Sequence, residues 1–155
     1  HLVLSTLHTN DAAGAVVRLV DMGIEPFLAA SSVIGVVAQR LVRVLCPRCR
    51  EPYTPPPEIV ARYGLAQNGD AAPVIYRAKG CEACNHIGYK GRVGLFEIMV
   101  MDDELRFLVV KNAPADAIKR AALGKGMRTL QHDGVAKVLA GVTSLEEMLR
   151  VVFVE

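Results

Sequence analysis

The chain has 155 residues, which suffice for one ordinary domain or for one domain with a small appendage. Its hydrophobic content of 52% and mean hydropathy of +0.29 indicate a folded core and exclude an intrinsically disordered chain. The 18 basic residues against 16 acidic ones leave a net charge of +2, so charge balance by itself does not indicate a nucleic-acid partner. The longest uncharged apolar run, residues 27–38, is too short to cross a bilayer, and we expect no membrane insertion.

Hydrophobic spacing and Gly/Pro positions predict the elements of the first third of the chain. In chain order they are a short buried strand over 2–7, a helix from about Ala12 to Gly23, a helix from Pro26 to about Gly35, and a strand over 36–45. The first helix follows a polar turn in which Thr9 or Asn10 can serve as the N-cap, with Asp11 favourable beside them.

The composition changes in the middle of the chain. Residues 51–73 are rich in proline and include the turn-forming run 68–70, so most of this stretch predicts a surface excursion, with a short helix over 57–63. Strands are predicted on its far side, over 74–77 and over 92–101.

The last third predicts four helices. They are a helix capped by Asp102 that reaches about Lys111, one from Pro114 to Gly124, one from Leu130 to Gly141, and a final one opened by the capping-box pair Thr143 and Glu146. Strands at the start and helices at the end favour an α/β core edge with a helical cap over a barrel or a bundle.

All four cysteines fall in two C-x-x-C frames, and they are Cys46, Cys49, Cys81 and Cys84. Two thiolates held two residues apart fit two corners of a tetrahedron, and a second pair completes a closed Cys₄ zinc site. Two disulfides are one alternative, although C-x-x-C neighbours would form a strained small loop. A redox pair is another, although two copies without a thioredoxin-like context disfavour it. We predict one structural zinc ion that closes the base of the excursion.

His8 lies between a predicted strand and a predicted helix. In open α/β sheets ligands bind at such positions, where an imidazole can reach a phosphate or orient a water molecule. Physical argument alone favours the alternative that His8 lies in an ordinary turn while Asn10 caps a helix. We expect His86 at the surface and His132 in a structural role.

Two further patterns bear on nucleotide binding. Four arginines could bind phosphate, but a solvated face is the favoured interpretation; they are Arg40, Arg43, Arg48 and Arg50. The sequence has no G-x-x-x-x-G-K-[ST] loop, so we expect this chain alone not to hydrolyse a nucleotide.

Taken together, these segments resemble the C-terminal part of the secretion ATPases, the family of the type II secretion motor and its type IV pilus assembly relatives. The matching segments are the histidine-box run 1–12, the segments 21–28 and 38–43, the four cysteines with 88–94, and the run 141–150. The resemblance covers essentially the whole chain. Segments 21–28 and 101–104 look more like the secretion branch than the pilus branch.

The resemblance implies the C-terminal part of a RecA-like ATPase domain with an inserted Cys₄ zinc subdomain and a helical C-terminal cap. The implied division is an ATPase core part over 1–45, a metal-binding subdomain over 46–91 and a strand with helices over 92–155. The histidine box implies that His8, and also His1, lie near the γ-phosphate of ATP. Because the chain begins at His1 and lacks a phosphate loop, we expect a fragment of a longer protein.

The resemblance also implies a setting. The parent would be a cytoplasmic homo-hexamer at the bacterial inner membrane that hydrolyses ATP with Mg²⁺, contacts inner-membrane secretion-platform proteins and drives pseudopilus assembly. Unpaired cysteines kept for metal agree with a reducing compartment. The alternatives are a type IV pilus assembly ATPase and a freestanding zinc module that binds nucleic acid or protein.

Overall fold

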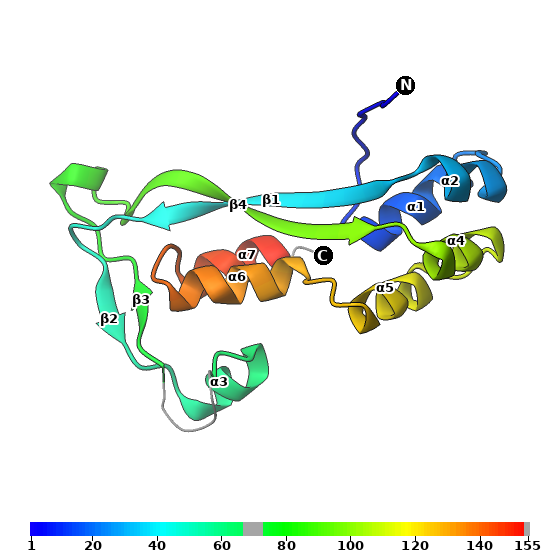
Figure 1. The fold of residues 1–155 in the computed structure, drawn as a ribbon. Coiled ribbons are helices and arrows are strands. Elements are labelled where there is room, and N and C mark those ends of the chain that lie inside the picture. Colours follow the sequence, from blue (N-terminus) through cyan, green and yellow to red (C-terminus); the bar gives the residue numbers. More distant parts are fainter. Residues whose placement is uncertain (67–72, 154–155) are drawn as a thin grey trace. The chain divides into compact units, whose positions relative to one another are not determined.

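The computed structural model describes residues 1–66 and 73–153 (Figure 1). Its elements are α1 (Ala12–Asp21), α2 (Pro26–Ser32), β1 (Gly35–Leu45), β2 (Glu51–Tyr53), α3 (Pro57–Tyr63), β3 (Ile75–Arg77), the 3₁₀ helix η1 (Glu82–Cys84), β4 (Tyr89–Val100), α4 (Asp103–Val110), α5 (Ala115–Gly124), α6 (Leu130–Leu139) and α7 (Leu145–Val152). The predicted mixed α/β class is therefore confirmed. The predicted turn over 68–70 lies outside the described residues.

The chain divides into two compact units, and both are discontinuous in sequence. The first unit consists of residues 1–38 and 96–129, and the second of residues 39–95 and 130 onward. β1 pairs with β4, and each of these strands passes from one unit into the other. The three-part division with boundaries at 45 and 91 stays a prediction.

The first unit packs α1 against α5 and α2 against α4. Small side chains line these helices, and the buried ones include Ala12, Ala13, Ala15, Ala29 and Ala30. On the β4 portion of this unit the residues alternate, with Glu97 and Met99 buried while Ile98 is 56% exposed. This period of two is the expected pattern for a strand with one covered face.

The N-terminal segment differs from the prediction. Residues 1–8 are exposed and form no strand, with Leu4 as much as 88% exposed, so the predicted buried strand over 2–7 is wrong for this chain. A strand is stable only when a neighbour pairs with its backbone N–H and C=O groups. Among the described residues, the sheets contain only the pairs β1–β4 and β2–β3.

The observed ends of α1, α2 and α7 also differ from the predicted ones. Asp11 caps α1, because its Oδ1 accepts a hydrogen bond from the Gly14 amide at 2.8 Å, so neither Thr9 nor Asn10 is the cap. α2 ends at Ser32 because the next residue is already extended, with φ −74° and ψ 122°.

At α7 the capping residue is Ser144, whose hydroxyl accepts from the Glu147 amide at 3.1 Å. The predicted pair of Thr143 and Glu146 is one residue too early. Thr143 donates its hydroxyl to the Arg43 carbonyl instead, at 2.8 Å.

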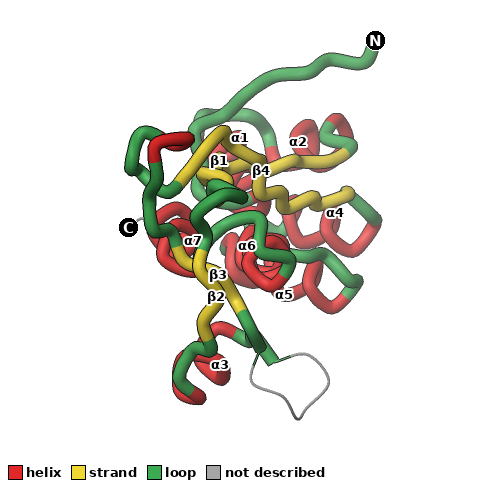
Figure 2. The backbone as a smooth tube through the Cα atoms, turned by 90° about the vertical axis from the view of Figure 1, so that its left-hand side faces the viewer, coloured by secondary structure: helices red, strands yellow, loops and turns green. Residues whose placement is uncertain are grey.

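In the second unit, α6 lies against α7 (Figure 1), and both contact β3. β2 and β3 form an antiparallel pair (Figure 2) with the partners Glu51 and Arg77, Pro52 and Tyr76, and Tyr53 and Ile75. Sequence analysis missed β2. The Pro52 in its middle lacks an amide donor, and such a residue is tolerated here because β2 has a partner on one side only.

Helix α6 approaches α7 closely at Gly134. A Cβ at this position would lie 2.5 Å from Cγ of Met148, a fully buried side chain, so the surrounding core would have to shift. We therefore expect Gly134→Ala to lower the free energy of unfolding by about 1–3 kcal/mol through overpacking.

The urea midpoint of unfolding checks this expectation. Gly124→Ala is the matched control, because a Cβ there meets nothing within 4 Å and the position is helical. A Gly134→Ala midpoint equal to that of the control would contradict the tight α6–α7 contact.

Among the described residues, no helix combines the length and the apolar character needed to traverse a lipid bilayer.

Candidate metal centre and histidine turn

The structure brings all four cysteine thiols together in the second unit. Their sulfur atoms lie within 4.8 Å of one another, although the two C-x-x-C frames are 35 positions apart. Cys46 Sγ is 4.0 Å from Cys81 Sγ, and Cys84 Sγ is 3.8 Å from both Cys49 Sγ and Cys81 Sγ. A disulfide bond would require about 2.0 Å. All four cysteines are free, so the alternative of two disulfides does not hold in this structure.

These separations suit a tetrahedral metal ion. Four sulfurs at about 2.3 Å from a central zinc ion lie about 3.8 Å from one another. Cys46 and Cys84 are buried and the other two thiols are half-buried, so an ion among them would be largely shielded from water. The cluster can bind a metal such as zinc, and four thiolates leave no coordination position open for a substrate.

Two tight turns present the thiols. In each turn the amide of the second cysteine donates to the carbonyl of the first, at 3.3 Å from Cys49 to Cys46 and at 3.1 Å from Cys84 to Cys81. The Cys46 amide also donates to the Gly88 carbonyl at 2.9 Å. This bond connects the two turns through the backbone and so helps to bring the two cysteine pairs together.

Two glycines allow the second turn to close. Gly80 and Gly88 have φ values of 106° and 78°, a left-handed conformation that side chains disfavour. A Cβ at Gly80 would lie 2.4 Å from the His86 carbonyl oxygen, and one at Gly88 would lie 2.6 Å from Cβ of Ala78. The backbone on both sides of the turn therefore approaches as closely as glycine permits.

The thiols share a polar environment that favours one thiolate. Burial raises the pKa of the Cys84 thiol, but the Cys81 and Gly88 amides point at its sulfur, and together with neighbouring thiols they lower this pKa to about 6. Burial raises the pKa of Cys49 to about 11, and the adjacent thiols add to this effect. A first thiolate opposes ionisation of the others, whereas a divalent cation would stabilise all four.

His86 and His132 lie outside the cluster of four cysteines. His86 is exposed, as expected, and the cluster of possible ligands among the described residues consists of the cysteines alone. His132 lies on α6 with an exposed side chain, so its predicted structural role is not that of a core residue.

His8 and His1 lie in the exposed N-terminal segment of the first unit. The turn after His8 leads directly into α1, because Thr9 donates its hydroxyl to the Asp11 carbonyl at 3.2 Å and Asp11 caps the helix. His8 thus precedes a capped helix N-terminus, as predicted, while the predicted strand on its other side is absent from the described residues; the role of His8 at a nucleotide stays a prediction.

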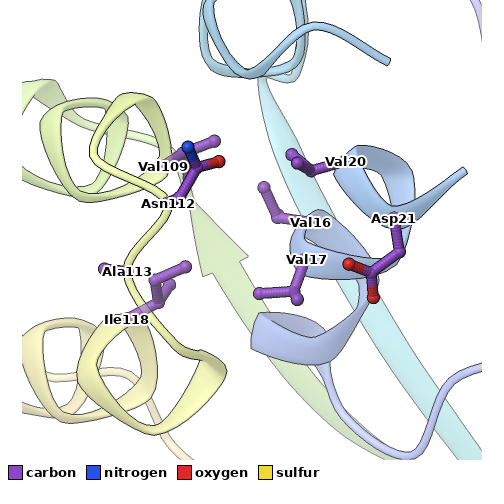
Figure 3. A pocket seen from close by; sticks show the side chains of 8 residues that line it. All are labelled: Val16, Val17, Val20, Asp21, Val109, Asn112, Ala113 and Ile118. Atoms are coloured by element: carbon purple, nitrogen blue, oxygen red, sulfur yellow. The ribbon is translucent and has the colours of Figure 1, made fainter. Parts of the chain in front are cut away.

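The first unit also has a small pocket of about 90 Å³ between α1 and the turn that joins α4 to α5 (Figure 3). Its lining residues are Val16, Val17, Val20, Asp21, Val109, Asn112, Ala113 and Ile118. Drug-sized ligands occupy pockets of about 300 Å³ or more, and His8 does not line this one. At this volume the pocket is too small to hold a nucleotide.

Two of the four clustered arginines bind protein groups in the second unit. Arg43 pairs with Glu147 at 2.6 Å, and its guanidinium stacks 4.2 Å from the centre of the Tyr89 ring. Arg50 donates to the Gly141 carbonyl at 2.6 Å and stacks on Tyr76. Both side chains remain solvent-exposed, in agreement with the favoured interpretation, and in addition each one contacts the segment around α7.

Sequence analysis missed two buried carboxylates, Glu147 and Glu97, each 1% exposed. Glu97 carried a usable signal, because it is the only charged residue between Arg92 and Asp102 in an otherwise apolar strand. Glu147 had no such signal in the sequence, because it lies beside Glu146 in the first turn of a helix, where acidic residues are common.

Comparison with known proteins extends over nearly the whole chain. A family model described as type II/IV secretion system protein matches residues 1–150. A type II secretion system protein E of Pseudomonas aeruginosa is 52% identical over 151 residues, which are 97% of this chain and 30% of that protein. A type II secretion system ATPase E of Vibrio cholerae is 50% identical over 152 residues, 97% of this chain and 29% of that protein.

A pilus relative is similarly close. The type IV pilus assembly ATPase PilB of Thermus thermophilus is 48% identical over 149 residues, which cover 96% of this chain and 17% of that protein. The chain thus spans less than a third of the length of each of these relatives.

Proposed function

Because the chain belongs to the type II/IV secretion system protein family, we propose that it is the C-terminal part of an ATPase that powers type II protein secretion. The observation that carries the proposal is identity of about half over 97% of the chain to proteins named for that system. A type IV pilus assembly ATPase is the second candidate, since the pilus relative is 48% identical.

The parent protein would have a RecA-like core and act as a cytoplasmic homo-hexamer at the inner membrane, where secretion-platform proteins are its partners. Its substrate would be ATP with Mg²⁺. Transfer of the γ-phosphoryl group depends mainly on positioning and on stabilisation of charge at the phosphate oxygens. A ring N–H of His8, and one of His1, would donate to those oxygens, and the turn into α1 would orient the His8 ring.

We propose zinc as the ion at the four cysteines. Soft thiolates in a tetrahedral arrangement select zinc over magnesium or calcium, which prefer oxygen ligands. The ion would supply a cross-link between the two cysteine turns and would take no part in hydrolysis. The chain would contribute the hydrogen bonds that shape the two turns, namely the amides aimed at the Cys84 sulfur and the bond from the Cys46 amide to the Gly88 carbonyl.

His8→Ala in the full-length protein tests the proposed nucleotide site. We expect ATP turnover to fall at least about tenfold, the loss typical of a missing group at a developing charge, while metal content stays unchanged. His132→Ala is the matched control, since this histidine is exposed on α6. Steady-state turnover and metal analysis give the two readouts. Turnover equal to that of the control would remove His8 from the mechanism.

A further inference from the structure

Two distant side chains hold the first residues of α1. Lys119 on α5 donates its ammonium group to Asp11 Oδ2 at 2.7 Å, although the two residues are 108 positions apart. Glu97 on β4 accepts the Ala12 amide at 2.9 Å through Oε1, across 85 positions. The cap and the first amide of the helix are therefore each bound to a different element of the first unit.

The charges of this arrangement support one another. Burial raises the pKa of Asp11, but the Lys119 ammonium and the Gly14 amide outweigh it and leave this pKa below its usual value. Burial lowers the pKa of Lys119, whereas Asp11 and the more distant Glu97 charge raise it, and the net change is upward. The Lys119 ammonium and the Asp11 carboxylate therefore stabilise each other's charged form.

The residues before Asp11 and those after it differ sharply in burial and in secondary structure. Residues 1–8 are exposed and carry no regular structure, while Ala12 and Ala13 are fully buried. The change occurs within the three residues that follow His8. Whatever orients Asp11 and Ala12 consequently sets the direction in which the His8 segment leaves the helix.

We propose that Lys119 and Glu97 are positioning residues that fix the turn before α1 and thereby present His8 to the nucleotide. The inference rests on the proposed function of His8, and neither residue needs to touch the nucleotide. It makes α5, in the C-terminal part of the chain, a direct support of the histidine turn. Because the ion pair joins the start of α1 to α5, we expect the effect of breaking it to be local.

Lys119→Ala in the full-length protein is the main variant. Lys119→Arg keeps the positive charge, and Arg120→Ala removes an exposed charge from the next position as a matched control. Two measurements are made on each protein. Hydrogen exchange follows the amides of residues 9–14, and steady-state kinetics give kcat and KM for ATP.

We expect Lys119→Ala to speed exchange over residues 9–14 and to lower kcat about 5- to 50-fold with little change in KM, because a misplaced group weakens mainly the transition state. Exchange in α6 and α7 should not change, Lys119→Arg should recover most of the activity, and Arg120→Ala should match the unmodified protein.

Unchanged exchange over residues 9–14 would overturn the inference whatever the kinetics show. Faster exchange with unchanged kcat would also overturn the inference. The kcat of the His8→Ala protein then shows whether the positioning role alone has failed or the proposed role of His8 as well. If the His8→Ala protein has a lowered kcat for ATP, only the positioning role of Lys119 and Glu97 has failed. If His8→Ala is also fully active, the proposed role of His8 has failed with it.

Discussion

Replacing Cys84 by serine should abolish stable metal binding, from about one ion per chain to almost none. The Cys84 thiol has a lowered pKa of about 6 and is 4% exposed, and its sulfur accepts two backbone amides that a serine oxygen could not reach at the same geometry. A hydroxyl is also a far poorer ligand for zinc than a thiolate.

Loss of the ion should loosen residues 46–90 and leave α4 and α5 unchanged. The cysteine turns close the stretch that contains β2, α3 and β3, and a structural metal bound there would contribute its binding free energy directly to folding of that stretch. Elemental analysis measures the ion, and hydrogen exchange resolved along the chain measures the loosening.

His86→Ala is the matched control, because His86 lies two positions from Cys84, is exposed and lies outside the cluster. Chelation of the unmodified protein provides an independent check, since it should release four titratable thiols and produce the same local exchange. A Cys84→Ser protein that retains one tightly bound ion, or a chelated protein with unchanged exchange at 46–90, would show that the cysteines do not form a structural metal site.

Glu147→Gln should produce the second large effect, a loss of roughly 2–4 kcal/mol in the free energy of unfolding. The Glu147 carboxylate is buried and accepts from the Arg43 side chain at 2.6 Å and from the Arg43 amide at 3.0 Å. Arg150 donates to both of its oxygens, at 2.8 and 3.0 Å. A glutamine keeps the shape but turns an NH₂ group toward one guanidinium.

The loss is large because several groups depend on this carboxylate. The Nε of Arg43 is already buried without a partner, so removing the negative charge leaves more of that guanidinium uncompensated. Tyr89 stacks on Arg43, and its hydroxyl bonds the Ser144 hydroxyl at 2.6 Å. Glu146→Gln removes an exposed charge from the adjacent position and should change stability by less than about 0.5 kcal/mol.

The same carboxylate predicts a pH dependence. Burial raises the pKa of Glu147, but the bonds from Arg150 and Arg43 outweigh it and lower this pKa to about 2. A depressed folded-state pKa contributes stability above the unfolded value near 4.5, and the contribution is lost as pH falls toward 2. The free energies of unfolding of the Glu147→Gln protein and the unmodified protein, measured with urea at several pH values, should therefore converge at low pH. Curves that stay parallel would exclude an ionised Glu147.

Local sequence signals determined much of the fold. α3 begins and ends at the predicted residues, because Pro57 opens it and Gly64, with φ 66°, stops it. α4 begins after Asp102, the predicted cap, which accepts from the Leu105 amide at 2.9 Å. Such signals act over three or four residues, so they are legible without any tertiary structure.

Predictions that required a distant partner were less successful. The apolar run over 2–7 has the composition of a strand but finds no neighbouring strand among the described residues, and it stays exposed. β2 was not predicted because its segment is rich in proline, and its pairing depends on β3, more than twenty positions away. The register of the α7 cap moved by one residue because Thr143 is bound to Arg43, a contact between residues 100 positions apart.

By itself, the sequence determined the cysteine pairs that could bind a metal, the family and the helical end of the chain, because each depends on residue types at short spacing. Each C-x-x-C frame holds its own two thiols close together, and the fold brings the two frames to one place, as predicted. Only the tertiary structure decided which charges are buried and what they hold: Glu147 between two arginines, and Glu97 with Lys119 at the start of α1. Burial and ion pairing depend on which distant segments come together, and no local pattern encodes that.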